Sequence, residues 1–599
     1  MGRGGSLPRH RRGKRGRYPY GSSQFALRAL PDRGILPAAI GRTVQRSSRA
    51  MISRQIVIVG GGPVGMLLAL NLAAIGTRSV LIDSGLRPRQ HPKGSTQNSR
   101  TMEHYRRLGF VERIRRLGLP PDHKTDVAYY TSLSGYELAR LPMPSERDKL
   151  AARDAAPAHD QVVEPIFRCN QMHVEAELFD IVHECPWVET RYGWTCTDWR
   201  EDADGVTAEI EEASTGRRET LSGSHLAGCD GGHGIVRRKL GVSYLGATPE
   251  AQPYLGGPMV STYLRAPDLH ATARDVCWQY WVVNQHVRSN IVSVDGKSEF
   301  LFNTRLERPD QQLDPDAIAA MFRQTAGCDI GVQYLSHQTW TAGQAFVASS
   351  FGGGRVWMAG DAVHLFTPTG GFGMNTGVDD AANLGWKLAA MAQGWGGPRL
   401  LASYEDERRP IAYRNTGAAK ALAINVGRTP VQAEIGETTP AGEAARRAAA
   451  EYLRGGGEEF ASLGVQLGAR YDGSPIVVPD AAPPADDLIR YRPSAAPGGR
   501  APHAWTGGGR SLGDSLFDRF APGFTVLRLG PNPPSADALR GAFAARGVPA
   551  TVVDVPDAAA RDLYERDLAV VRPDQHVAWR GNADPPDADA VVSRITGGN

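Results

Sequence analysis

A glycine-rich turn near residue 60 restricts the architecture of this chain more than any other part of the sequence. The apolar, β-branched run Gln55–Val59 leads into the turn, and the helical run Met66–Ile75 follows it. Gly60, Gly62 and Gly65 give the turn the spacing G-x-G-x-x-G. The first glycine permits a tight turn, the second lets the backbone approach a pyrophosphate, and the third allows close packing of helix on strand. The sequence therefore predicts a Rossmann-like α/β domain that binds a dinucleotide.

An acidic residue at a fixed distance supports the same interpretation. The apolar run Ser79–Ile82 predicts a second strand, and Asp83 closes it 21 residues after Gly62. A carboxylate in this place accepts hydrogen bonds from the diol of a ribose. A glycine-rich turn without a ligand would not account for an acid at that offset. The pattern alone does not distinguish FAD from NAD.

A second glycine-bearing block lies roughly 300 residues downstream and decides between them. It runs G-R-V-W-M-A-G-D-A-V-H from Gly354, then P-T-G-G-F-G-M-N from Pro368 and D-A-A-N-L-G-W-K-L from Asp380. This block closely resembles the second FAD fingerprint of the FAD-dependent aromatic hydroxylases, the group of phenol and 2,4-dichlorophenol hydroxylases. The resemblance implies that Asp361, at the end of a strand, binds ribityl hydroxyls, and that a helix from about Asn375 directs its positive end at the flavin ring.

Three shorter motifs between these blocks carry the same resemblance. Arg100, in N-S-R-T-M-E, matches the arginine that lies against FAD in that family, and Gln171 matches its flavin-contacting glutamine. Asp230, in A-G-C-D-G, matches the Asp-Gly motif that serves both FAD and the reduced nicotinamide cofactor. Two positions depart from the family: Gly234 stands where serine is usual, and Phe372 where glutamine is frequent.

The resemblance implies a cofactor site and a reaction. FAD contacts are expected from Gly60, Gly62, Pro63, Gly65, Asp83, Arg100, Gln171, Asp230, Asp361, Gly371, Gly373, Met374 and Asn375. NADPH or NADH would reduce FAD, and O2 would then form a flavin C4a-hydroperoxide that hydroxylates a phenolic ring in a site closed to water. The main-chain carbonyl of Pro368 is the expected contact near the reacting edge. No side chain is assigned as a base, and His364 is expected to be structural.

The same comparison predicts the domain organisation. An FAD-binding domain at 51–430 contains an inserted mixed or antiparallel substrate sheet, built from about 121–164 and 243–344. Trp278–Val283, Asn290–Val294 and Glu299–Phe302 are expected strands of this sheet, and Tyr280 and Trp281 either line an aromatic pocket or pack within the sheet. A helix and linker at 431–489 lead to a thioredoxin-like C-terminal domain at 490–599. That domain has no redox cysteine, because the last cysteine is Cys328.

Residues 1–50 form a basic leader. They contain 11 Arg and 1 Lys against a single Asp, a net charge of +11 in a chain whose total is +4, so the body carries −7. We interpret the leader as disordered and as a start-site artefact, with translation beginning at Met51. An organellar transit peptide and a nucleic-acid-binding arm are the other interpretations, but no clean amphipathic period or basic, aromatic groove supports them.

Composition excludes other classes of protein. Hydrophobic residues make up 41% and charged residues 22%, as in ordinary globular proteins, and no apolar stretch is long enough for a membrane span. The six cysteines show no C-x-x-C pair and no histidine at ligand spacing, so neither a disulfide framework nor a metal site is expected. We expect a cytoplasmic enzyme whose partners are a small aromatic substrate and O2, without nucleic acid or membrane; a homodimer stays open.

Three rival functions remain at this stage. The scaffold also suits tailoring of a polycyclic or polyketide aromatic, because its pocket enlarges readily. A flavin-holding but inactive scaffold protein belongs to another class, and an NAD-dependent dehydrogenase is the remaining enzyme.

Overall fold

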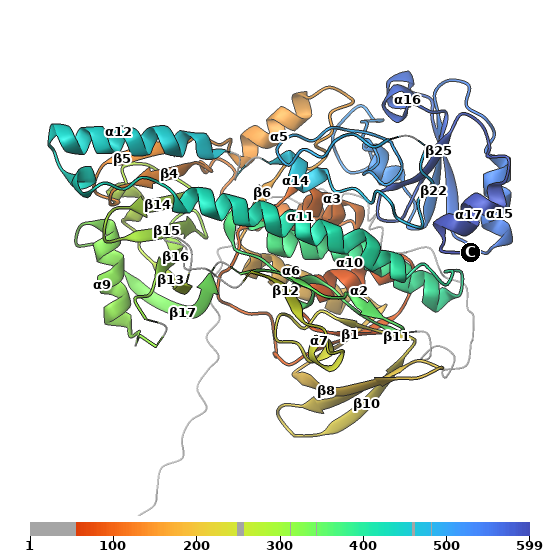
Figure 1. Ribbon diagram of the computed structural model, residues 1–599, viewed down its shortest axis with the longest axis horizontal. Helices are drawn as coiled ribbons and strands as arrows, with labels where there is room; N and C mark the ends of the chain where they lie inside the picture. The colour runs from red at the N-terminus through yellow and green to blue at the C-terminus, as the bar shows by residue number, and fades with distance from the viewer. Residues whose placement is uncertain are drawn as a thin grey trace, which may run out of the picture. The chain divides into compact units, whose positions relative to one another are not determined.

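The computed structural model describes residues 55–247, 257–308, 310–311, 313–342, 344–457, 460, 462–480 and 482–598 (Figure 1). The basic leader and the expected start at Met51 lie outside these residues. The fold is the expected α/β architecture, with a parallel sheet for the dinucleotide, a separate mixed sheet and a C-terminal α/β domain.

A six-stranded sheet forms the centre of the dinucleotide-binding part. Its order is β19-β20-β11-β1-β2-β7, and neighbouring strands are parallel except for the edge pair β19 and β20. All residues of β1 are buried, which suits its alternating isoleucine and valine. The strands are β1 Ile56–Val59, β2 Ser79–Asp83, β7 Val188–Tyr192, β11 His225–Gly228, β19 Gly352–Gly353 and β20 Val356–Met358.

Helices from distant parts of the sequence cover this sheet. Helix α2 packs against α10, and the long helix α11 also contacts α10 (Figure 1). Leu67 of α2 and Leu384 of α10 belong to one buried core with the strands of the sheet. The two glycine-bearing blocks are therefore held together by apolar packing. These helices are α2 Pro63–Ala74, α3 Ser99–Arg107, α6 Gln171–Glu184, α10 Phe372–Gln393 and α11 Ala402–Gly427.

The inserted sheet has seven strands in the order β17-β13-β16-β15-β14-β4-β5. Only β4 and β14 pair in parallel, so the sheet is mixed as expected. Helix α9, Pro315–Ala326, packs on one face, and α12, Pro440–Arg454, packs on the other. The strands are β4 Val127–Tyr130, β5 Glu137–Leu141, β13 Gly257–Arg265, β14 Gln279–Val283, β15 Arg288–Ser293, β16 Glu299–Arg305 and β17 Gln333–Ala342.

Two adjacent aromatic residues of β14 point to opposite faces of this sheet. Trp281 lies on the α12 face and stacks on Tyr129, with ring centroids 6.1 Å apart. Tyr280 lies in the core beneath α9, where its hydroxyl accepts a hydrogen bond from the amide of Cys277. Successive side chains of a strand alternate between faces, so the two cannot line one pocket. Of the two alternatives, packing within the sheet therefore holds for Tyr280.

The C-terminal domain is a four-stranded sheet in the order β23-β22-β24-β25. Strands β22 and β23 are parallel, and the other pairs are antiparallel. Trp386 of α10 shares a buried cluster with Phe524 of β22, so this domain packs directly on the FAD-binding part. Its elements are β22 Phe524–Leu529, α15 Asp537–Ala545, β23 Ala550–Val555, α16 Ala558–Tyr564, β24 Leu568–Val571, β25 Val577–Gly581 and α17 Ala588–Ile595.

Shorter elements connect these three parts. No helix among the described residues has the length and apolar composition needed to cross a bilayer. The connecting helices and strands are β3 Thr96–Gln97, α4 Val111–Arg115, α5 Glu146–Ala155, β6 Phe167–Arg168, β8 Trp194–Glu201, β9 Val206–Glu212, β10 Arg218–Gly223, α7 Ile235–Lys239, β12 Tyr244–Ala247, α8 Leu269–Thr272, β18 Ala345–Ala348, β21 His364–Leu365 and α14 Leu463–Leu467.

Candidate functional site

Each of the three glycines of the first turn has a different structural role. Gly60 has φ of 109°, and a Cβ there would lie 2.2 Å from the carbonyl oxygen of Cys229. A Cβ at Gly65 would lie 1.9 Å from the carbonyl oxygen of Gly60, so helix and strand approach too closely for any side chain. A Cβ at Gly62 would meet no atom within 4 Å. The space beside Gly62 at the start of α2 therefore suits a phosphate group.

Asp83 shapes this turn from the end of β2. Its two carboxylate oxygens accept hydrogen bonds from the amides of Gly61, at 2.7 Å, and Gly85, at 2.8 Å. The hydroxyl of Tyr192 donates to the carbonyl oxygen of Gly61 at 2.9 Å. A carboxylate has about four acceptor positions, so Asp83 retains capacity for a ribose diol beside the turn.

Asp361 follows β20 in a short 3-10 turn, Gly360–Ala362, and its side chain is exposed. Three residues later, His364 is fully buried, and its Nε2 lies 2.6 Å from Asp380 Oδ2. The guanidinium of Arg408 donates to the other oxygen of Asp380 at 2.8 Å. His364 thus has the buried, hydrogen-bonded surroundings expected of a structural residue.

The first turn of α10 is fixed by one amide side chain. Asn375 donates to the carbonyl oxygens of Gly371, at 2.6 Å, and Thr96, at 3.0 Å, and accepts from the amide of Asn98 at 3.0 Å. Gly371 has φ of 66°, which favours glycine, and the helix begins directly after it at Phe372, earlier than the expected start near Asn375. The amide of Gly371 donates to the carbonyl of Pro368 at 3.0 Å.

Phe372, Gly373 and Met374 occupy the same turn. Phe372 is buried in a cluster with Ala419 and Val465, so the departure from glutamine adds apolar packing behind the helix start. Met374 packs against the main core, and a Cβ at Gly373 would lie 3.5 Å from Phe366.

Asp230 presents one oxygen without a partner. Its Oδ2 accepts from the amide of Val236 at 3.0 Å, whereas its buried Oδ1 has no hydrogen-bond partner among the described residues. Burial raises the pKa of Asp230. A Cβ at Gly234 would lie 2.2 Å from this carboxyl group, so a serine here would require the Asp230 side chain to move. A ligand hydroxyl that donates to Oδ1 would remove the cost of leaving it unpaired.

The carboxyl ends of four parallel strands bring these residues together. Gly60 follows β1, Asp83 ends β2, Asp230 follows β11, and Asp361 follows β20. A Cβ at Gly360 would lie 2.9 Å from Val64 of α2, so the second block directly contacts the first. Ligands of open α/β sheets bind at this edge. The arrangement fits one dinucleotide held by both fingerprints.

Arg100 and Gln171 lie nearby with partners that the sequence did not indicate. The buried guanidinium of Arg100 donates to Glu103 at 3.0 Å, to the side-chain oxygen of Gln575 at 2.9 Å and to the carbonyl of Asp574 at 2.7 Å. The last two residues belong to the C-terminal domain. Gln171 begins α6, and its side chain donates to Glu175 at 2.6 Å.

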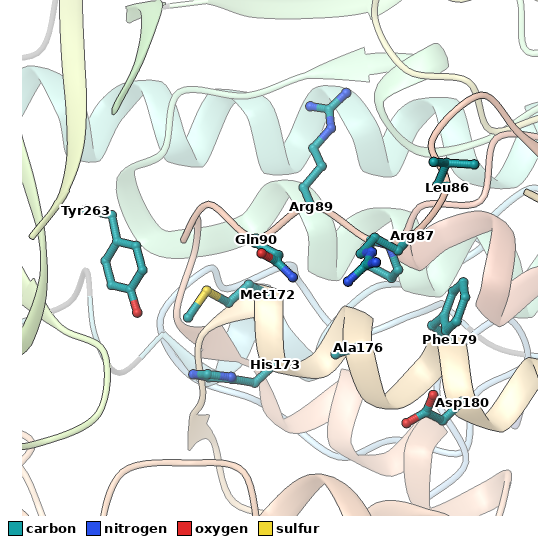
Figure 2. Close-up of a pocket in the computed structure, with 11 residues that line it drawn as sticks. Leu86, Arg87, Arg89, Gln90, Met172, His173, Ala176, Phe179, Asp180 and Tyr263 are labelled. Carbon is teal, nitrogen blue, oxygen red and sulfur yellow. The ribbon is translucent and has the colours of Figure 1, made fainter. Parts of the chain in front are cut away.

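A cavity of about 640 Å³ lies between α6 and the segment that follows Asp83 in the sequence (Figure 2). Arg87 and Arg89 lie in its wall, and neither forms an ion pair with a described residue. The Arg-Pro-Arg sequence after Asp83 was the available signal, and sequence reasoning did not use it. The cavity is lined by Leu86, Arg87, Pro88, Arg89 and Gln90 of the segment after β2, by Met172, His173, Ala176, Phe179 and Asp180 of α6, and by Tyr263 of β13.

Acid is expected to weaken the attachment of this cavity wall to the inserted sheet. His91 Nδ1 lies 2.8 Å from the hydroxyl of Ser336 on β17. Burial first, and then Lys93 and His337, lower the pKa of His91 to about 4. The unfolded chain therefore binds the extra proton between pH 6.5 and 4, and folded-state stability falls as pH falls through this window.

Between pH 7 and 4, we expect the His91→Asn variant to lose less folding stability than the wild type, by on the order of 1 kcal/mol. Thermal unfolding across this pH range measures the difference. The exposed position His159 gives a control, since His159→Asn should leave the profile unchanged. Equal profiles for both variants would contradict the prediction.

Comparison with known proteins agrees with this geometry. A family model described as an FAD binding domain matches residues 53–419, and one described as the C-terminal region of aromatic-ring hydroxylases matches residues 494–598. The FAD-dependent monooxygenase apdD of Emericella nidulans is 31% identical over 585 residues, covering 90% of each chain. The phenol 2-monooxygenase of a Pseudomonas species is 26% identical over 590 residues, covering 92% of this chain and 93% of that protein.

A solved structure extends the similarity to the whole fold. The rebeccamycin biosynthetic enzyme RebC with reduced flavin superimposes with a TM-score of 0.80 and 32% identity, covering 92% of this chain and 99% of that one. The matched segments include both fingerprints, the inserted sheet and the C-terminal domain. The chain therefore belongs to the FAD-dependent aromatic-ring hydroxylases and is an aromatic monooxygenase.

Proposed function

We propose that this enzyme uses NAD(P)H and O2 to hydroxylate a phenolic ring, with FAD bound along the carboxyl edge of the six-stranded sheet. The observation that carries the proposal is the convergence of both glycine-bearing blocks on that edge, together with the space beside Gly62 and the buried Asp230 Oδ1, which has no hydrogen-bond partner among the described residues. Similarity to a phenol 2-monooxygenase over nearly the full length supports a phenolic substrate.

The protein's own groups have separate tasks in this proposal. Gly62 and the N-terminus of α2 hold phosphates, Asp83 holds a ribose, and Asp361 meets the ribityl chain. When bound, FAD supplies electron transfer from NAD(P)H and activation of O2, which no side chain here provides. The helix start after Gly371 favours negative charge on the reduced ring. The remaining proposed FAD contacts are Gly60, Pro63, Gly65, Arg100, Gln171, Asp230, Gly373, Met374 and Asn375.

Substrate orientation rests on the inserted sheet and on one carbonyl group. The α12 face of that sheet is apolar, which would exclude water from the reacting ring. The carbonyl of Pro368 is the proposed contact near the reacting edge, and the first turn of α10 positions it through Gly371.

A polycyclic phenol is the second candidate substrate class. A putative polyketide hydroxylase of Streptomyces halstedii is 30% identical over 558 residues, against 26% for the phenol 2-monooxygenase, which supports this class.

A panel of one-ring and multi-ring phenols tests both candidates. We expect the purified protein to be yellow, absorbing at about 450 nm, and to form hydroxylated product in proportion to the NADPH consumed with at least one member of the panel. Coupled product from multi-ring phenols only would select the second candidate. Bound flavin without product from any phenol would contradict the proposal and favour an inactive scaffold, and a colourless protein that oxidises NADH would favour a dehydrogenase.

We further propose that the cavity between α6 and the segment after Asp83 receives the phosphate groups of NAD(P)H. Its two unpaired guanidinium groups suit an anionic ligand, and Phe179 offers a ring for stacking. The double variant Arg87→Ala, Arg89→Ala is expected to raise the KM for NADPH by about tenfold or more while leaving bound FAD unchanged.

Steady-state kinetics with NADPH and NADH measures this effect. Arg447→Ala, at an exposed ion pair on α12, is the matched control and should leave KM unchanged. Loss of FAD from the double variant, or an unchanged KM, would contradict this assignment of the cavity.

A further inference from the structure

The geometry points to Gln575 of the C-terminal domain as a positioning residue for the flavin site, acting through Arg100. The inference rests on the proposed function, in which Arg100 contacts FAD. It assigns to the C-terminal domain a direct part in cofactor binding, in addition to its packing role.

The contact itself spans nearly the whole chain. Arg100 Nη1 donates to Gln575 Oε1 at 2.9 Å, and Nη2 donates to the carbonyl of Asp574 at 2.7 Å, across sequence separations of 475 and 474 residues. All three residues are buried, with at most 5% of their surface exposed. Two of the donors of Arg100 are therefore oriented by the C-terminal domain.

Gln575 adopts a backbone conformation that disfavours its own side chain. Its φ is 65°, and only three other described non-glycine residues, Arg274, Ala536 and Glu565, have positive φ. In addition, the buried Nε2 of Gln575 has no hydrogen-bond partner among the described residues. Both features are unfavourable, and such strain persists where the surroundings require a particular geometry. Here the geometry places Oε1 on Arg100.

The segment around Gln575 is anchored on the two helices beside the flavin site. Arg572 donates to both oxygens of Glu407 on α11, at 2.6 and 2.8 Å. The side chain of Asp574 accepts from Asn383 of α10 at 3.1 Å. Helix α10 starts directly after Gly371 and also contains Asn383. The same helix therefore carries both the residue that anchors Asp574 and the proposed contacts with the flavin ring. The anchor therefore fixes Arg100 relative to that helix start.

A neutral hydrogen-bond acceptor suits the orientation of the Arg100 guanidinium better than a carboxylate does. Arg100 also faces Glu103, at 3.0 Å, and Asp379, at 3.5 Å, which would draw its guanidinium toward themselves. These two acids are shared with other cations, Glu103 with Arg500 and Asp379 with Arg408. An amide oxygen orients Arg100 without neutralising it, so its positive charge remains available to an anionic ligand.

The test uses the full-length protein with three substitutions. Gln575→Gly removes the acceptor and relieves the unfavourable φ, whereas Gln575→Glu keeps an acceptor of the same length but adds a negative charge beside Arg100. Ala536→Gly relieves φ at another buried position of the C-terminal domain, with no contact to Arg100, and is the matched control. FAD affinity by fluorescence titration, product formed per NADPH consumed, and thermal midpoint are measured for each.

We expect Gln575→Gly to raise the Kd for FAD by about tenfold and to lower the product formed per NADPH, with a thermal midpoint no lower than that of Ala536→Gly. Gln575→Glu should also raise the Kd for FAD, because its carboxylate would neutralise the charge of Arg100 that the anionic ligand needs. A changed midpoint without a change in Kd or coupling would overturn the inference, as would an unchanged Kd. If the wild-type protein bound no FAD, the proposed function would fall and this inference with it.

Discussion

Replacing Gly62 by valine is expected to give a folded but colourless protein. A Cβ at this position meets no protein atom within 4 Å, so the fold should tolerate the side chain. The valine would instead occupy the space in which the pyrophosphate of FAD approaches the backbone. We expect the affinity for FAD to fall by at least about 100-fold, corresponding to about 3 kcal/mol, while the thermal midpoint of the apoprotein stays unchanged.

Titration with FAD and apoprotein unfolding measure the two parts of this prediction. Gly331→Val is the matched control, because a Cβ at Gly331 also meets nothing within 4 Å and the residue lies outside the site. Normal FAD affinity in Gly62→Val would show that the pyrophosphate does not bind at this turn. It would thereby remove the main support for the proposed function.

Features of the site that depend on local sequence were predictable. One short strand–turn–helix segment contains Gly60, Gly62 and Gly65, so their spacing alone identifies the motif. Asp83 was also predictable, because it is the last residue of the apolar strand β2. The second block extended this to FAD because its residues also lie in one strand–turn–helix unit.

Features that depend on distant contacts were not predictable. Nothing near Arg100 in the sequence indicates that residues 574 and 575 will bind its guanidinium. The close approach of the Asp230 carboxyl group to Gly234 likewise appears only in the folded turn. The cavity at Arg87 and Arg89 likewise depends on how α6 and β13 approach the segment after β2.

Tyr280 illustrates why one pair of alternatives stayed open. The alternation of a strand already implies that Tyr280 and Trp281 face opposite sides, so only one of them can line a pocket. The sequence did not indicate which face α12 would cover, since α12 lies more than 150 residues downstream. The alternation of side chains along the strand could therefore be predicted from the sequence. The helix that covers each face of the sheet could not.

Removing the buried charge of Arg572 is expected to destabilise the whole enzyme. Arg572 is fully buried between the C-terminal domain and α11, and it pairs with both Glu407 and Asp574 at 2.6 Å. Arg572→Met keeps much of the volume but leaves these carboxylates without their shared cation. Breaking a buried pair from one side typically costs about 3–5 kcal/mol, so we expect a loss of this size at pH 7 in urea unfolding. Arg447→Met, at an exposed pair, should cost less than about 0.5 kcal/mol.

The pH dependence of this loss identifies its origin. Burial alone would raise the pKa of Glu407, but Arg572 and Lys387 outweigh burial and lower it to about 2. In the wild type, the stability from this group is present above the unfolded pKa of about 4.5 and is lost as pH falls toward 2. Without Arg572, only Lys387 is left as a cation to oppose burial, so the pKa of Glu407 rises, and its protonation in acid relieves part of the destabilisation. The difference between wild type and Arg572→Met should therefore shrink as pH falls from 7 to 4, and a difference independent of pH would assign the loss to packing instead of charge.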